Sequence, residues 1–298
     1  MNSVISILLD LGEFIYKPNP GNIGDALIAV ATKKLFLEYN LPFIPAHSVS
    51  PNTLSYNFVY GGGGACIPDW GCIPTLIQLF SSPQMDRVVI LPSSFYGCEA
   101  LLEVFDERFT VFCRDEISFN YCTCRNRKAR FLLANDMAFG LNVRMFLSEE
   151  IWKTAISNSN VFLLTEEWIR KSMYTLQDGR KVLLFLRNDR ESRLGISHSI
   201  RYKYRTVDLS AVHCDDWCDA NLASTWSYLF LTCLDNADVI LTDRLHAAIG
   251  GHLLGKEVHI LDNTYRKLSS VYYYSLYRSP NVKLLSSLEE FPYWHALV

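Results

Sequence analysis

The sequence predicts an α/β protein with parallel, doubly wound sheets, in which strands alternate with helices along the chain. Two observations lead to this fold class. Short apolar runs recur throughout, and segments with apolar residues at helical spacing separate them. Most of the runs end in glycine or in charged residues. Such alternation is typical of parallel sheets, because a crossover helix is needed to bring each strand back beside the previous one.

The first half of the chain contains five apolar runs that predict strands. They lie at residues 14–17, 57–60, 87–94, 109–115 and 131–136. Apolar residues at helical spacing predict helices between them, at residues 26–39, 98–107 and 116–124. We expect a first domain over residues 1–155.

The second half begins a new α/β series near residue 181, after a joining region at about residues 141–180. Strands are expected at residues 181–187, 239–242, 257–262 and 282–285. Helices are expected at residues 221–236, 247–254, 268–277 and 288–297, and residues 192–218 are expected to form a loop or small insertion. We therefore expect a second domain over residues 156–298.

Composition excludes several classes of protein. The chain has 298 residues, of which 49% are hydrophobic and 20% charged, so it can bury two cores. Its net charge of −3 lacks the basic surplus of a general nucleic-acid binder. No stretch reaches the roughly 18 apolar residues of a membrane span, and the N-terminus has no basic region typical of a signal peptide. Nine cysteines, without paired metal-ligand spacing, favour a reducing cytoplasm and predict no metal site.

Two glycine-rich loops mark the candidate site in the first half. Gly21-Asn-Ile-Gly-Asp25 joins the first strand to the first predicted helix, and Gly61-Gly-Gly-Gly64 follows the second strand. Glycines let the backbone approach a ligand closely, and ligands of open α/β sheets bind at the carboxyl ends of the strands. A tight turn with Asp25 as helix cap, and a flexible loop at residues 61–64, are the structural alternatives.

The candidate site in the second half follows the strand at 239–242. Asp243, Arg244, Leu245 and His246 come next, at the start of a predicted helix. A helix N-terminus favours anions, and a guanidinium adds a planar fork for phosphate or carboxylate. The alternative is that Arg244 pairs with an acid and that His246 is a core histidine.

Other strand ends add to both candidate sites. In the second half Arg187 and Lys267 follow strands, so cations surround a histidine and predict a site for a small, highly charged anion. In the first half the glycine loops and the carboxylates of Asp25 and Asp136 suit a neutral, hydroxyl-rich acceptor.

Over most of its length the chain resembles the polysaccharide pyruvyl transferases. The motifs that carry the resemblance are Gly21-Asn-Ile-Gly-Asp25, Gly61-Gly-Gly-Gly64, Leu91-Pro-Ser-Ser94, Cys113-Arg-Asp-Glu116 with Ser118, Asn135-Asp136, Arg187-Asn-Asp-Arg-Glu191, Asp243-Arg-Leu-His-Ala247 with Gly255, and Asp262 followed by Lys267. The resemblance implies two Rossmann-like domains facing a cleft, as in GT-B glycosyltransferases. It also implies transfer of pyruvate from phosphoenolpyruvate to two sugar hydroxyls as a ketal.

The resemblance implies a role for each candidate residue. Arg187, Arg244, Lys267 and the backbone at Leu245 would hold phosphoenolpyruvate in the second domain, and His246 would act as general acid and base. In the first domain Asp25 would orient or deprotonate the acceptor hydroxyl. The other residues expected to bind the acceptor are Asn22, Gly24, Gly62, Gly63, Asp136 and Asp189. No metal or cofactor is required, because arginines can neutralise the developing phosphate charge.

Two other functions stay open at this point. One is a GT-B-like glycosyltransferase that uses a nucleotide-sugar, and the other is a non-catalytic carbohydrate-binding protein. The expected location is the cytoplasm, or the inner face of the membrane if the saccharide acceptor is lipid-linked. A tyrosine-rich helix at residues 268–277 could stack on sugars or pack in the interior. The acceptor sugar and the oligomeric state are not predicted.

Overall fold

The computed structural model describes residues 1–48, 55–149, 173–187, 206, 208, 212–214, 216–262 and 266–296. The chain divides into two units. Unit 1 comprises Met1–Gly21, Asp25–Leu141 and Cys214–Ala223, and unit 2 comprises Asn22–Gly24, Asn142–His213 and Ser224–Val298. The expected domain limit between residues 155 and 156 lies outside the described residues.

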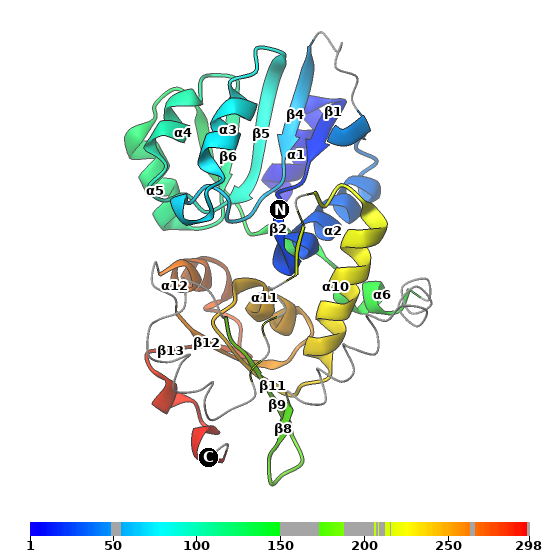
Figure 1. Ribbon diagram of the computed structural model, residues 1–298, viewed down its shortest axis with the longest axis vertical. Coiled ribbons are helices and arrows are strands. Elements are labelled where there is room, and N and C mark those ends of the chain that lie inside the picture. Colours follow the sequence, from blue (N-terminus) through cyan, green and yellow to red (C-terminus); the bar gives the residue numbers. More distant parts are fainter. Residues whose placement is uncertain are drawn as a thin grey trace. The chain divides into compact units, whose positions relative to one another are not determined.

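Unit 1 is built on a six-stranded sheet whose paired strands are all parallel (Figure 1). Its strands are β1 (Phe14–Lys17), β3 (Phe43–Pro45), β4 (Tyr56–Tyr60), β5 (Met85–Ser93), β6 (Phe109–Cys113) and β7 (Arg130–Leu133). Their order is β3-β1-β4-β5-β6-β7. The chain therefore places β3 on one side of β1, and then β4 and the later strands on the other side. This reversal lies at the carboxyl ends of β1 and β4, the position at which open α/β sheets bind ligands.

Helices accompany this sheet, and Figure 1 shows α3, α4 and α5 together beside β5 and β6. The helices are α1 (Asn2–Leu11), α2 (Ile23–Glu38), α3 (Ile73–Phe80), α4 (Glu99–Val104) and α5 (Glu116–Arg125), with single 3-10 turns at Ala46–Ser48, Pro68–Trp70 and Met137–Gly140. Asp115 starts α5, because its carboxylate accepts hydrogen bonds from the Ser118 amide at 2.8 Å and hydroxyl at 2.9 Å. Aromatic rings of Phe80, Phe105 and Phe109 pack in the core between these elements.

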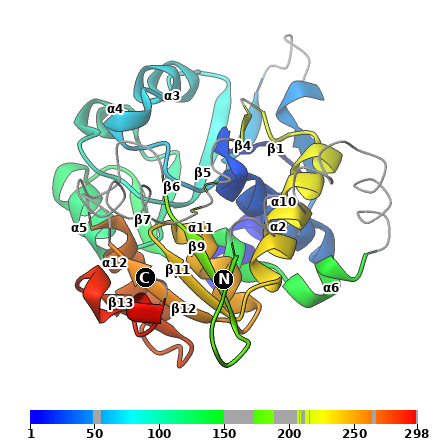
Figure 2. The same ribbon diagram turned by 60° about the horizontal axis from the view of Figure 1, so that its bottom comes forward.

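Unit 2 contains a five-stranded sheet. Its strands are β8 (Met173–Thr175), β9 (Lys181–Phe185), β11 (Val239–Thr242), β12 (Glu257–Leu261) and β13 (Val282–Leu285). Figure 2 labels its strands β9, β11, β12 and β13. The order is β13-β12-β11-β9-β8, and only β8 pairs antiparallel among these described strands. A further short sheet joins β2 (Gly21–Asn22) to β10 (His213–Cys214). Each unit thus confirms the α/β class.

The helices of unit 2 include α11 (Leu245–Leu253), which packs closely on its sheet. The others are α6 (Val143–Leu147), α10 (Ala220–Asp235), which enters the unit at Ser224, α12 (Lys267–Val271) and a π-helical turn at Tyr272–Leu276. A β-carbon at Gly251 would lie 2.8 Å from the Val258 side chain and 2.9 Å from that of Ile240. Glycine at this position therefore lets α11 approach β11 and β12.

The structure contradicts one helix that the sequence predicted and differs in part from another. The segment 288–297 forms two single 3-10 turns, Leu288–Glu290 and Trp294–Ala296, instead of an α-helix. Pro292 lies between them, and proline cannot donate the backbone hydrogen bond that a continuous helix needs. The helix expected at 268–277 starts as α12 and continues as the π-helical turn. Among the described residues, none of the helices has both the length and the apolar character of a membrane-spanning segment.

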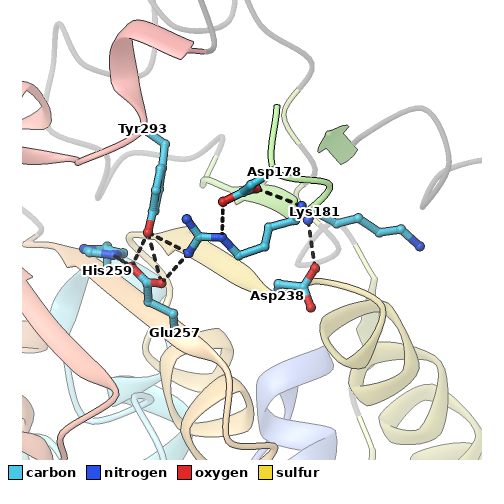
Figure 3. A network of polar contacts seen from close by, with 7 residues as sticks. Asp178, Lys181, Asp238, Glu257, His259 and Tyr293 are labelled. Carbon is cyan, nitrogen blue, oxygen red and sulfur yellow. Dashed lines mark hydrogen bonds and ion pairs between the residues drawn. The ribbon is translucent and has the colours of Figure 1, made fainter. Parts of the chain in front are cut away.

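A polar network at the amino end of the unit 2 sheet ties the C-terminal segment to the strands (Figure 3). The Arg180 guanidinium contacts Glu257 at 3.3 Å and the Tyr293 hydroxyl at 2.9 Å, and this hydroxyl donates to Glu257 at 3.0 Å. His259 Nε2 lies 2.7 Å from Glu257 Oε1, and its ring meets Phe291 edge-on at 5.1 Å. The network therefore joins β9, β12 and the last turns of the chain.

We predict that His259 makes the stability of unit 2 sensitive to acid. Burial lowers the pKa of His259, although Glu257 opposes this shift. Below the unfolded pKa of about 6.5 the unfolded chain binds a proton that the folded ring resists, so stability falls as pH drops. The His259→Phe variant should lose less thermal stability than wild type between about pH 7.5 and pH 5. His295→Phe, at an exposed position, is the matched control and should behave as wild type. Equal acid sensitivity in His259→Phe and wild type would contradict this interpretation.

Candidate active site

The carboxyl ends of β1 and β4 carry a chain of buried polar groups in unit 1. Tyr60 OH donates to Asn19 Oδ1 at 2.7 Å, and Asn19 Nδ2 donates to Asp25 Oδ1 at 2.8 Å. Burial raises the pKa of Tyr60 well above its usual value, so this hydroxyl remains a donor at neutral pH. The amide of Asn19 thereby orients the Asp25 carboxylate, which is buried.

Glycine backbone encloses the same carboxylate. A β-carbon at Gly63 would lie 2.8 Å from Asp25 Oδ1, and one at Gly21 would collide with Asp25 Oδ2. Both glycines have positive φ, 143° and 144°, which other residues rarely adopt. A β-carbon at Gly62 would in turn collide with the Pro92 carbonyl. The glycine run at 61–64 is therefore tightly packed rather than a flexible loop.

A second buried network is hydrogen-bonded to the backbone of the glycine run through Ser94. Ser94 N donates to Gly63 O at 3.0 Å, and Ser94 Oγ accepts from Arg114 Nε at 2.8 Å. Arg114 Nη1 is paired with Asp136 Oδ2 at 2.7 Å, and both of these side chains are 0% exposed. Asp136 also caps the turn at Met137–Gly140 through the Ala138 amide. The described structure gives Asp136 an interior supporting position, where the sequence led us to expect contact with an acceptor.

The carboxyl ends of β9 and β11 bring Arg187, Asp243 and Arg244 together in unit 2. The Arg187 amide donates to Asp243 Oδ1 at 2.7 Å, and the side chains of both arginines are largely buried. Arg244 Nη2 is paired with Asp208 Oδ2 at 2.7 Å. The Arg244 amide is held by Thr242 Oγ1 at 2.9 Å. The described residues therefore place two guanidinium groups and two carboxylates at this edge.

Burial dominates the electrostatics of Asp243. It raises the pKa of this carboxyl to about 6, although the Arg187 amide and the positive charges of Arg187 and Arg244 oppose the shift. The negative charge of Asp208 adds to the rise. Asp243 therefore changes charge just below neutral pH, beside the two candidate anion-binding arginines.

His246 lies in the first turn of α11, against the backbone of Gly24. A β-carbon at Gly24 would overlap His246 Nδ1 and would lie 2.7 Å from Cγ of the ring. The Gly24 amide is itself held by Asn22 Oδ1 at 2.8 Å. The structure thus brings Asn22 and Gly24, expected on the acceptor side, together with His246 in unit 2, while Asp25 belongs to unit 1.

The other predicted residues are only partly described. Leu245 begins α11 directly after Arg244, and its side chain is buried. Lys267 begins α12, but its side chain lies outside what the structure describes, and so does the whole of Asp189. The roles of these residues stay predictions.

A possible metal-ligand group occurs elsewhere in unit 1. Ligand atoms of His47, Asp216 and Cys218 lie within 4.8 Å of one another. However, Asp216 Oδ1 already accepts from the Cys218 amide at 2.7 Å, and the Lys33 ammonium donates to Cys218 O at 2.7 Å. Burial raises the pKa of the Cys218 thiol to about 12. We interpret the group as a turn that the Asp216 carboxylate caps, with the positive charge of Lys33 balancing the negative charge of Asp216.

Comparison with known proteins identifies the family. A family model described as polysaccharide pyruvyl transferase matches residues 22–265, which include the described candidate residues from Asn22 to His246. The chain belongs to the polysaccharide pyruvyl transferase family. A crystal structure of a functionally uncharacterised protein from Klebsiella pneumoniae is similar, with a TM-score of 0.74 and 27% identity over 96% of this chain and 97% of that one. Comparison with curated proteins finds no match.

We predict that the pyruvyl transferase will not tolerate a side chain at residue 24. In Gly24→Ala the new methyl group and the His246 ring cannot occupy the same space, so the ring must move. From the role expected for His246, kcat should fall by about 100-fold, since a misplacement of about 1 Å can cost that much. Gly140→Ala is the matched control, because its β-carbon would meet only the ends of flexible side chains, at 3.3 Å and beyond. Unchanged transferase activity in folded Gly24→Ala would show that this contact does not position His246.

Proposed function

We propose that the protein transfers the pyruvyl group of phosphoenolpyruvate to two hydroxyls of one sugar, with release of phosphate. The sugar would belong to a cell-surface polysaccharide or its precursor, and the product would be a cyclic ketal. One observation carries the proposal. In a chain of this family, two buried arginines lie at neighbouring strand ends, with a histidine at the start of the helix that follows.

The donor is assigned to unit 2. Phosphoenolpyruvate carries a phosphate and a carboxylate, and the planar guanidinium groups of Arg187 and Arg244 suit both. The amide of Leu245 lies at the N-terminus of α11, where backbone N–H groups and the helix dipole favour an anion. Lys267 is assigned as a further cation. We also propose that the two units are the Rossmann-like domains of a GT-B-like enzyme.

The acceptor is assigned to unit 1. Asp25 would accept a hydrogen bond or proton from an attacking sugar hydroxyl, with Gly62 and Gly63 lining the same surface. Asn22, Gly24 and Asp189 are further candidates for acceptor contact, whereas Asp136 would act through Arg114 and Ser94. No metal or cofactor takes part in the proposed reaction. The protein would work in the cytoplasm, at the inner face of the membrane if the acceptor is lipid-linked.

The proposed chemistry has two stages. His246, protonated, gives its proton to the methylene carbon of phosphoenolpyruvate, and the first hydroxyl oxygen bonds to C2 as Asp25 takes its proton. The bond from C2 to the phosphate oxygen then breaks, and the departing phosphate is neutralised by the arginines. The second hydroxyl bonds to C2 and closes the ketal. The two hydroxyl protons balance the proton on the new methyl group and the one on phosphate.

The identity of the leaving group tests this function. The protein is incubated with phosphoenolpyruvate and a panel of glycans, and separately with UDP- and GDP-sugars, while phosphate and nucleotide are measured. We expect acceptor-dependent release of phosphate and a product that is heavier by one pyruvylidene group. Release of UDP or GDP, without phosphate from phosphoenolpyruvate, would identify a glycosyltransferase instead. Absence of turnover with all acceptors would favour a carbohydrate-binding protein.

Two substitutions separate the proposed roles in unit 2. His246→Ala should lower kcat by about 100-fold to 10,000-fold, because general acid–base catalysis contributes about that much. Arg244→Ala should raise the KM for phosphoenolpyruvate by about 10-fold to 100-fold, as expected for a lost hydrogen bond to a charged group. Arg278→Ala, at an exposed arginine of the same unit, is the control and should change neither constant. Wild-type kcat in His246→Ala, or an unchanged KM in Arg244→Ala, would refute the respective role.

A further inference from the structure

Unit 1 presents an exposed tyrosine on a short, rigid loop directly after β5. Phe95 is buried, whereas the next residue, Tyr96, is 55% exposed. The Phe95 amide donates to Ser118 Oγ at 2.9 Å, and the Cys98 amide donates to Tyr121 OH at 2.8 Å. The loop is therefore fixed on both sides of Tyr96, and its exposure follows from the backbone path.

The Tyr96 ring packs against a second aromatic ring. It packs at 6.3 Å against the ring of Tyr121, with an interplanar angle of 36°. The guanidinium of Arg125 lies 4.0 Å from the centroid of the Tyr121 ring, and Arg125 is paired with Glu99 at 3.2 Å. Aromatic packing and the cation–π contact hold Tyr121, so one side of the Tyr96 ring is backed by an ordered layer, and the residue as a whole is 55% exposed.

The loop is joined to the glycine run beside Asp25. Gly63 forms a parallel bridge with Ser93, the Ser94 amide donates to Gly63 O at 3.0 Å, and the Tyr96 amide approaches the Cys66 carbonyl at 3.5 Å. Tyr96 thus belongs to the same strand-end edge of unit 1 as the carboxylate assigned to the acceptor. The loop residues Phe95, Tyr96, Gly97 and Cys98 carry no formal charge, which suits a neutral ligand better than an anion.

We propose that Tyr96 is a stacking platform for a pyranose ring of the saccharide acceptor. The C–H groups on one face of a pyranose are apolar and fit the face of an aromatic ring, while its hydroxyls stay available for hydrogen bonds. Tyrosine suits this task because it offers a large contact area and loses little conformational entropy. The proposal rests on the proposed function of unit 1 and adds a residue that sets acceptor affinity without taking part in proton transfer.

Saccharide binding without turnover is the direct test. Saturation-transfer NMR of the full chain is recorded with methyl glycosides of glucose, galactose, mannose and their 2-acetamido forms, in the absence of phosphoenolpyruvate. We expect wild type, Tyr96→Phe and Tyr96→Trp to saturate at least one glycoside, and Tyr96→Ala to lose at least about two-thirds of that signal. Tyr39→Ala is the matched control, since this tyrosine is 41% exposed but follows the C-terminus of α2.

Kinetics add a second measurement where an acceptor is turned over. Tyr96→Ala should raise the KM for that acceptor by about tenfold, the upper range for one aromatic contact, and leave the KM for phosphoenolpyruvate unchanged. Equal binding of glycosides by wild type and Tyr96→Ala, or no binding by wild type, would overturn the platform. The same holds if Tyr96→Ala changes only the oligomeric state, because the patch would then join copies of the chain. The NMR result does not depend on the donor, so it distinguishes failure of the platform from failure of the pyruvyl-transfer function.

Discussion

The close approach of backbone to the side chains of Asp25 and His246 is the constraint on which both candidate sites depend. Gly21 and Gly63 enclose the Asp25 carboxylate, and Gly24 lies against the His246 ring. A single methyl group at any of these three positions would occupy space that the side chain already fills. The loop at residues 21–25 contributes to both units, since Asn22–Gly24 belong to unit 2 and Gly21 and Asp25 to unit 1. Gly21 in this loop therefore leaves room for the Asp25 carboxylate, and Gly24 leaves room for the His246 ring.

The two units differ in how they balance charge. In unit 1 the Asp25 carboxylate is oriented by a neutral amide and surrounded by backbone, while the buried charges of Arg114 and Asp136 neutralise each other behind the glycine run. In unit 2 two buried arginines lie with Asp243 and Asp208. The proposed donor anion would bind Arg244 either together with the Asp208 carboxylate or in its place. Exchanging one carboxylate for another ligand oxygen keeps the guanidinium paired, so the cost of leaving a buried charge alone is avoided.

The sequence predicted much of the fold, because apolar periodicity reports directly on parallel strands and their helices. β1, β9, β11 and β12 lie within about two residues of their expected limits, an error typical of strand ends. α1 was not predicted, although Val4, Leu8 and Leu11 have helical spacing. β3 contains only three residues and gives no periodic signal. Arg187 and Arg244 were expected near each other because strand ends share one edge of a sheet, and the structure places both at the ends of the neighbouring strands β9 and β11. The alternative that Arg244 pairs with an acid is confirmed, but its partner Asp208 and the Arg114–Asp136 pair were not predicted, since tertiary packing alone decides which distant charges meet.

Asp136 shows why residue type and strand-end position do not determine a role. It follows β7 at the edge where ligands bind, as Asp25 follows β1, and both are carboxylates. The difference lies in their partners. Asp25 meets an amide and glycine backbone, whereas Asp136 is enclosed with Arg114 and uses its other oxygen to cap a turn. A fully buried ion pair of this kind fixes geometry, because removing either partner would leave a charge without compensation. Through Ser94 that rigid pair reaches Gly63, so the interior acid helps to hold the backbone that shapes the surroundings of Asp25.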